Sequence, residues 1–296
     1  MVIKSLLKLS AVCCLFIFTS IFGQVNDRTL TSGSTYVKRD SYFSKPIHLI
    51  DLPTASILRG GDLETSIRLY ENGGALAKIS VGISRYFMLG VAYGGTNMLG
   101  GQTVSFNKMP GVQLVYRVIE ENLKLPALVV GFDSQGWGQW WTEYDTVLPD
   151  SVNKDQLAIM DNRYTVKSRG FYVMMSKAFD PSLIRVGLHG GISLSLEGRN
   201  SIGKYVDNDP TVFMAMDSQL SKDITTLFEY DFGINDEQLN GGKGFFNIGL
   251  RWALTESMFF EFVYKNILAD GVDLMDGTQV PGKVRLIRFS YTSSVK

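Results

Sequence analysis

The chain has 296 residues, with 29 basic and 29 acidic side chains and 45% hydrophobic residues. This length is enough for one large domain or two small ones. A net charge of zero gives no reason to expect a nucleic-acid partner or an acidic partner, so neither is predicted.

Residues 1–23 have the pattern of a signal peptide. Lys4 and Lys8 precede an apolar run over 9–22 that contains no acidic residue, and Gly23 supplies a small residue before Gln24. The run is short for a spanning helix, which needs about 20 apolar residues. A membrane anchor is the alternative reading of this segment.

Both cysteines, Cys13 and Cys14, lie in the predicted signal peptide. The mature chain would therefore form no disulfide and use no thiolate chemistry. Val12 precedes Cys13 where lipidation needs a small residue, which disfavours a lipoprotein. No later apolar run approaches 18 residues, so no helical span is expected. An exported chain of this kind, rich in amphipathic strands, indicates a soluble periplasmic β protein or an outer-membrane barrel.

Residues 24–59 are mixed and polar, without clear periodicity. We interpret them as an N-terminal segment that lies either in the periplasm or against the interior of a barrel, and the sequence leaves both open. The barrel itself is expected over residues 60–296.

Strict alternation of apolar and polar residues recurs from residue 63 onward. It is clearest over 223–234, where Phe228 and Tyr230 fall on one parity and Glu229 and Asp231 on the other. Such a period of two predicts strands with one apolar face. The predicted strands are 63–70, 75–84, 87–94, 112–119, 125–133, 169–179, 183–197, 211–220, 223–234, 246–254, 258–265 and 283–292. An even number of strands is typical of bacterial single-chain barrels.

The lengths of the connections decide between a barrel and a soluble sandwich. Apart from the first, every odd-numbered connection is long and every even-numbered one is short. Outer-membrane barrels alternate in this way because periplasmic turns are short and outer loops are long. We therefore predict an all-β fold: a closed antiparallel transmembrane β-barrel of about 12 strands in the bacterial outer membrane. Both termini would be periplasmic, and the loop 134–168 would lie outside.

In such a barrel the apolar faces point to lipid and the charged faces line the lumen. Aromatic residues near strand ends agree with interfacial girdles. The strands 169–179 and 283–292 have no clear facing. The candidate lumen-lining residues are Glu64, Arg68, Lys78, Arg117, Asp133, Arg185, His189, Asp217, Glu229, Asp231, Arg251, Glu261 and Lys265.

The titratable residues offer little support for an enzyme. A hydrolytic triad at the lipid surface would need His189 on the outward parity, but it falls on the inward one. His48 has no partner motif for a metal site, so no metal or cofactor is predicted. Glu229 and Asp231, with Glu261, could serve a glycosidase, but a charge network with the lumen arginines and lysines is the simpler interpretation.

The segment 134–141, with the sequence SQGWGQWW, is the most distinctive local feature. Indole faces stack on sugar rings, and amides bind hydroxyl groups. Trp137, Gln139, Trp140 and Trp141 are therefore candidate sugar contacts in an outer loop. An aromatic girdle, or a loop that folds into the pore mouth, is the alternative.

Three patches resemble a known family. They are LPTA at 52–55 with GGDL at 60–63; LPALVVGFD at 125–133 with Gln135-Gly136; and RYTVKS at 163–168 with MSK at 175–177 and LHGG at 188–191. Together they resemble the YjbH-type outer-membrane proteins, which accompany exopolysaccharide secretion systems. The resemblance covers about residues 52–197, and better-known members are longer and often lipoproteins.

The resemblance implies a role in exopolysaccharide or envelope polysaccharide export or assembly, with polysaccharide or other envelope proteins as partners besides outer-membrane lipid. A general porin-like diffusion channel is the alternative function, and an outer-membrane hydrolase is a more distant one. The barrel is expected to be a monomer.

Overall fold

The computed structural model describes residues 45–101, 103–141, 162–179, 185–197, 209–236, 242–268, 272–273, 279–280 and 282–294. The predicted signal peptide 1–23 and residues 24–44 lie outside the described residues. In the described part, no helix is both long and apolar enough to cross a membrane.

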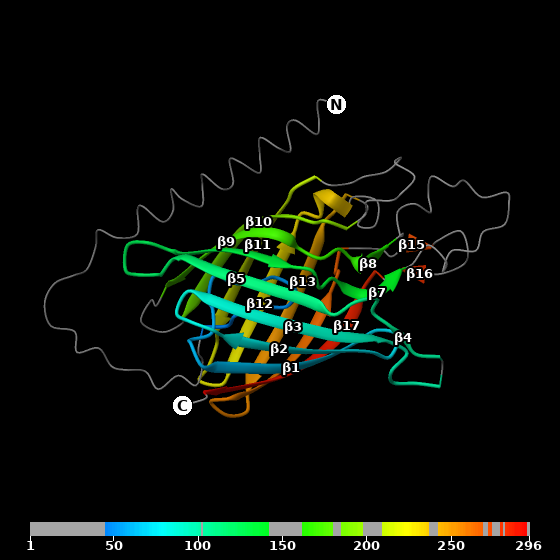
Figure 1. The fold of residues 1–296 in the computed structure, drawn as a ribbon, viewed down its shortest axis with the longest axis horizontal. Helices are drawn as coiled ribbons and strands as arrows, with labels where there is room; N and C mark the ends of the chain where they lie inside the picture. Colours follow the sequence, from blue (N-terminus) through cyan, green and yellow to red (C-terminus); the bar gives the residue numbers. More distant parts are fainter. Residues whose placement is uncertain are drawn as a thin grey trace, which may run out of the picture. The chain divides into compact units, whose positions relative to one another are not determined.

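Twelve antiparallel strands close into a barrel, as the sequence predicts (Figure 1). Each strand pairs with its neighbours in chain order, and β1 closes the ring by pairing with both β2 and β17. The strands are β1 (Asp62–Tyr70), β2 (Gly74–Gly82), β3 (Phe87–Thr96), β5 (Gly111–Ile119), β6 (Ala127–Asp133), β9 (Gly170–Phe179), β10 (Val186–Leu194), β11 (Thr211–Gln219), β12 (Ile224–Asp231), β13 (Phe245–Ala253), β14 (Met258–Lys265) and β17 (Val284–Ser294).

The two ends of the barrel differ. The short connections lie at one end, here called the turn end, and most long connections lie at the other, the loop end. The loop end carries the short elements β4 (Ser105–Phe106), β7 (Trp137–Trp141), β8 (Arg163–Val166), η2 (Ile234–Asp236), β15 (Val272–Asp273) and β16 (Gln279–Val280). Strands β7 and β8 form one hairpin, β15 and β16 another, and both lie at the right in Figure 1.

The connection between β1 and β2 is the exception to the loop pattern, because it is short yet lies at the loop end. Asn72 and Gly73 sit at its centre with φ values of 56° and 60°. An Asn-Gly pair with two positive φ angles forms the tight hairpin turn whose twist matches that of the flanking strands. Local turn chemistry therefore explains this departure.

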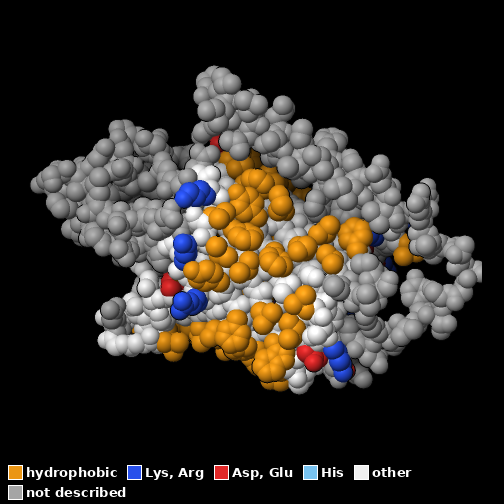
Figure 2. Space-filling view, turned by 180° about the vertical axis from the view of Figure 1, so that it is seen from behind, with side chains coloured by type: hydrophobic (Ala, Val, Ile, Leu, Met, Phe, Trp, Pro, Cys, Tyr) orange, Lys and Arg blue, Asp and Glu red, His pale blue; other side chains and the backbone are white. Residues whose placement is uncertain are grey.

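The outer surface of the barrel is apolar. Figure 2 shows a band of hydrophobic side chains across one face, with charged side chains toward its margins. Among the outward positions of the described strands, the charged residues are Lys177 and Arg285, each near an end of its strand. A closed barrel with an apolar exterior is the form in which β-strands span an outer membrane.

The interior is not uniformly polar. Inward positions on several strands carry buried apolar side chains that pack against residues 47–58. These wall residues include Met88, Val115, Val129, Tyr172, Met174, Phe213, Leu227, Val263 and Leu286. Strand β9 is apolar on both parities for this reason: Phe171 and Val173 face outward, whereas Tyr172 and Met174 face this inner core. In β17, Arg288 is buried inside and Arg285 is exposed outside.

Replacing Phe262, an exposed residue in the middle of β14, by arginine should destabilise the barrel in vesicles by about 2–4 kcal/mol, because it places a charge against hydrocarbon. Denaturant titration of the heat-modifiable gel band measures this effect. Glu120→Arg, at an exposed site on the turn end, is the control. Equal stability of the two variants would contradict a lipid-facing β14.

Candidate functional site: the filled lumen

Residues 45–59, here called the plug, occupy the lumen. The segment starts near the turn end and folds back through a tight turn in which Leu49 N donates to Leu52 O at 3.0 Å. Thr54 N then donates to Ile47 O at 3.1 Å, so the two arms pair. Gly60 and Gly61 connect the plug to the start of β1. The structure thus places this part of the N-terminal segment inside the barrel, one of the two locations left open by the sequence.

Glu229 on β12 binds the tip of the plug. Its carboxylate oxygen Oε1 accepts the backbone N–H groups of Ile50 at 2.6 Å, Asp51 at 3.0 Å and Leu52 at 2.9 Å. Consecutive amides that converge on one anion form a nest, and charge-assisted bonds of this kind are stronger than neutral ones. Glu229 is 1% exposed, so water does not compete for this contact.

Asp51 at the tip carries a second set of charge contacts. One carboxylate oxygen lies 2.6 Å from Arg68 Nη2 on β1, and the other lies 2.6 Å from Lys265 Nζ on β14. Burial alone would raise the pKa of Asp51, but the two cations outweigh it and hold this pKa well below its usual range. The carboxylate is therefore ionised at neutral pH.

Arginines from the wall bind the plug's carbonyl groups. Arg251 donates to His48 O at 2.7 Å, and Arg288 donates to Leu49 O and to Ile50 O. Arg251 and Arg288 are in turn held by Glu261, which accepts from both and is 1% exposed. Both donors and acceptors of the plug backbone thus have partners on the wall, as buried peptide groups require.

A third contact involves three neighbouring strands. Ala55 N donates to Ser176 Oγ at 2.8 Å; Ser176 Oγ lies 2.8 Å from His189 Nδ1, and His189 Nε2 lies 2.8 Å from Asp217 Oδ1. These residue types match a hydrolytic triad, but the serine oxygen is occupied by a plug amide and the group is buried in the lumen. We interpret the chain as a tether for the plug.

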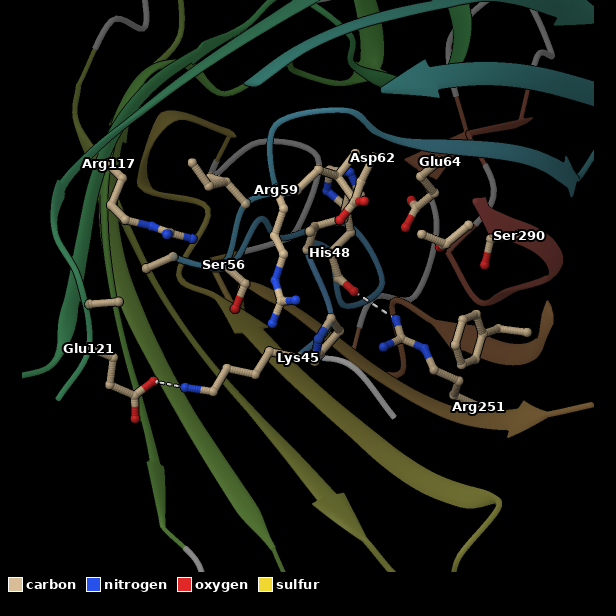
Figure 3. A pocket seen from close by; sticks show the side chains of 18 of the residues that line it. Lys45, His48, Ser56, Arg59, Asp62, Glu64, Arg117, Glu121, Arg251 and Ser290 are labelled. Atoms are coloured by element: carbon tan, nitrogen blue, oxygen red, sulfur yellow. Dashed lines mark hydrogen bonds and ion pairs between the residues drawn. The ribbon is translucent and has the colours of Figure 1, made fainter. Parts of the chain in front are cut away.

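An open cavity of about 860 Å³ remains between the plug and the wall at the turn end. Figure 3 shows Arg59, Arg117 and Glu64 around it, with Lys45 of the plug paired to Glu121. Charges of both signs line it, so it favours neither sign strongly. Burial, aided by nearby cations, lowers the pKa of His48 well below its usual value, so this imidazole is neutral at pH 7.

At the loop end the hairpin of β7 and β8 is fixed to the barrel rim. Arg163 forms two 2.7 Å bonds with the Asp236 carboxylate, and Lys167 Nζ donates to Asn235 O at 2.8 Å. The guanidinium of Arg68 lies 3.9 Å from the ring centroid of Trp137. The hairpin therefore reaches the layer of charges that holds the tip of the plug.

The candidate lumen residues all lie on inward positions of their strands or directly beside them. Most are buried: Arg68, Asp133, His189, Asp217, Glu229, Asp231, Arg251, Glu261 and Lys265. Glu64, Lys78, Arg117 and Arg185 are partly exposed. Glu229 and Asp231 do not form a catalytic pair, because Glu229 binds the plug and Asp231 is bound by Arg169. Among the described residues, no His, Cys, Asp or Glu cluster could hold a metal ion.

The candidate sugar contacts are only partly accessible. Trp140 packs edge-on against Tyr164 with 4.8 Å between ring centroids, and Trp141 is buried with Nε1 bonded to Thr165. The carbonyl of Gln139 accepts from the same threonine hydroxyl. These residues stabilise the hairpin, and Trp137 is the one that faces the lumen charges. Their role in sugar binding stays a prediction.

Asp51, Arg288 and the apolar part of the wall were not predicted from the sequence. A usable signal was present: Met88 and Leu227 stand on the inward parity of their strands, where a water-filled lumen gives no reason for large apolar side chains. Such residues indicate that something apolar packs inside the barrel.

No protein-family model and no curated protein matches this chain. Several solved structures are similar in architecture. The KdgM porin has a TM-score of 0.42 and 10% identity over 78% of this chain and 98% of its own. The NanC porin has a TM-score of 0.43 and 11% identity over 79% and 100%, and Omp33 of Acinetobacter baumannii has 0.38 and 9% over 79% and 97%.

Replacing Glu229 by alanine should loosen the plug, because the amides of residues 50–52 lose their acceptor and each unpaired buried donor costs about 1–3 kcal/mol. A Leu52→Cys reporter, in a chain with Cys13→Ser and Cys14→Ser, is expected to react with maleimide at least about tenfold faster. Thr225→Ala, an inward change on the same strand, is the control. Unchanged labelling would show that Glu229 does not hold the plug.

The ion pairs of Asp51 with Arg68 and Lys265 should stay intact as the pH falls from 7 to 5. The two cations lower the pKa of Asp51 in the folded protein. Its ion pairs therefore stabilise the bound plug fully above the unfolded-state pKa of about 3.9, and this stabilisation is lost only below that pH. In a Glu229→Gln chain, where the neighbouring carboxyl group no longer titrates, bilayer conductance is expected to stay at its pH 7 level until about pH 4 and then to rise. Opening near pH 6 would contradict this assignment.

Proposed function

We propose that the protein is an outer-membrane conduit whose own N-terminal segment keeps it closed. One observation carries the proposal: a short segment, packed against side chains of the wall, occupies the lumen of a twelve-stranded barrel. In an eight-stranded barrel the interior side chains alone can fill the lumen. Twelve strands enclose more space than that. A barrel of this size without the plug would contain a passage lined by both charged and apolar side chains.

The plug is held in a way that permits release. Its tip is bound by hydrogen bonds and ion pairs from Glu229, Arg68, Lys265 and Arg288, and no covalent bond joins it to these residues. If the turn end faces the periplasm, as outer-membrane barrels are oriented, both termini are periplasmic. The plug would then enter from the periplasm, where a partner or a solute could act on it. This arrangement supports a regulated conduit more than a general diffusion pore.

Export or assembly of an envelope polysaccharide is the more specific function that we propose for this conduit. Part of the first patch and part of the third patch that resemble YjbH-type proteins meet at the plug. Ala55, from the first patch, donates to Ser176, which contacts His189, and both of these belong to the third. Three residues of the resembling patches therefore form one contact that holds the plug, which supports a shared way of closing the barrel. Loss of surface polysaccharide on deletion of the protein tests this part.

Deleting residues 45–59 should convert a closed barrel into a conducting one. The full chain is expected to conduct little in planar bilayers, and the deletion variant to show stable single-channel steps. Replacement of 142–161 by a four-residue Gly-Ser linker, which is long enough to connect the paired strands β7 and β8, serves as the comparison and should conduct far less than the plug deletion. Equal, high conductance of the full chain and the plug deletion would favour a general diffusion channel.

A further inference from the structure

We infer that the seat of Asp51 is a carboxylate-binding site of the barrel wall, and that solutes carrying a sugar carboxylate compete with Asp51 for it. The inference rests on the proposed function, because it names the solute class to which the closed conduit responds. The carboxylate of Asp51 then occupies the site as an intramolecular competitor, and binding of the solute displaces the plug.

The geometry of the seat is that of a carboxylate site. Arg68 comes from β1 and Lys265 from β14, and β17 lies between these two strands. Each cation meets a different oxygen of Asp51 at 2.6 Å. Both cations are buried, with side chains 5% and 6% exposed, so the contact is made in a medium of low dielectric.

The charge balance shows why the seat would attract an anion once the plug moves. Glu261 stays on the wall and continues to pair with both Arg251 and Arg288, so one carboxylate serves two cations. Among the described residues, the ion pairs of Arg68 and Lys265 are with Asp51 alone. Removal of Asp51 therefore leaves Arg68 and Lys265 without their ion-pair partner. The four cations of the wall then face only the carboxylates of Glu229 and Glu261, so the empty seat carries a net positive charge. An arriving carboxylate restores the balance, and a neutral solute does not.

The neighbouring residue points to a sugar. Trp137 lies against Arg68, with 3.9 Å between the guanidinium carbon and the ring centroid. Indole rings pack on the apolar faces of sugars, so a carboxylate held by Arg68 places an attached sugar ring beside an aromatic side chain. The free space at this point is only about 30 Å³, lined by Asp51, Arg68, Lys78 and Trp137 among others. A uronic-acid sugar is far larger than one water molecule, so it fits only when the plug leaves.

The test uses the full chain in vesicles, with tryptophan fluorescence as the readout and a galacturonate trimer as the probe. Maltotriose, a neutral sugar of similar size, is the matched ligand. The trimer should change the fluorescence in a saturable way, and maltotriose should not. Asp51→Asn should bind the trimer about tenfold more tightly, because the internal competitor is gone. Arg68→Gln combined with Lys265→Met should weaken binding about a hundredfold.

Two controls separate this site from general charge effects. Glu120→Gln removes an exposed acidic residue that pairs with Arg85 at the turn end, and it should behave as the unmodified chain. Trp137→Phe should reduce the fluorescence change while calorimetry still detects the trimer. Retained heat-modifiable migration of each variant shows that it is folded.

Equal responses to the trimer and to maltotriose would overturn the inference, as would unchanged trimer affinity in Asp51→Asn. These outcomes are distinct from failure of the proposed function, which is read from the conductance of the plug deletion. A plug deletion that conducts, together with no carboxylate preference, would retain the conduit and reject the site.

Discussion

A peptide segment enclosed in a barrel needs hydrogen-bond partners for its backbone N–H and C=O groups. The rest of the structure depends on which groups of the wall supply those partners. The plug has no sheet to join, so charged side chains of the wall supply the partners. Glu229 accepts the amides at the tip, and Arg251 and Arg288 donate to the carbonyls beside them. Buried charges need counter-charges, and Glu261 pairs with Arg251 and Arg288 while Asp51 pairs with Arg68 and Lys265. The same network therefore closes the lumen and sets its charge.

The barrel could be predicted from the sequence because its signals are local and repeated. Alternation over 223–234 follows from the two environments of a strand, and the alternating loop lengths follow from repeated crossing of the membrane. Inward placement of Glu229, Asp231 and Arg251 follows from parity alone. The Asn72-Gly73 turn, the one departure from the loop pattern, also has a local explanation.

The plug could not be predicted in the same way, because its conformation is determined by distant residues. Residues 45–59 have no periodicity, and their partners lie as far along the chain as Arg288. In the sequence nothing distinguishes Asp51 from other loop residues. Its partners Arg68 and Lys265 lie on two different strands and meet it only in the folded barrel. Parity places Met88 and Leu227 on the inside but does not give the reason. They pack against the plug, whose position is not visible in the sequence. Tertiary packing, and not local propensity, decides this part of the structure.

The link between the plug and β1 is only Gly60 and Gly61. A segment tethered so closely keeps a high effective concentration at its seat, in the millimolar range for short flexible linkers. Re-closure is therefore intramolecular and independent of how many copies of the protein are present. A freely diffusing competitor has to match that local concentration, so the conduit would respond to an abundant or multivalent polymer and ignore a trace of monomer.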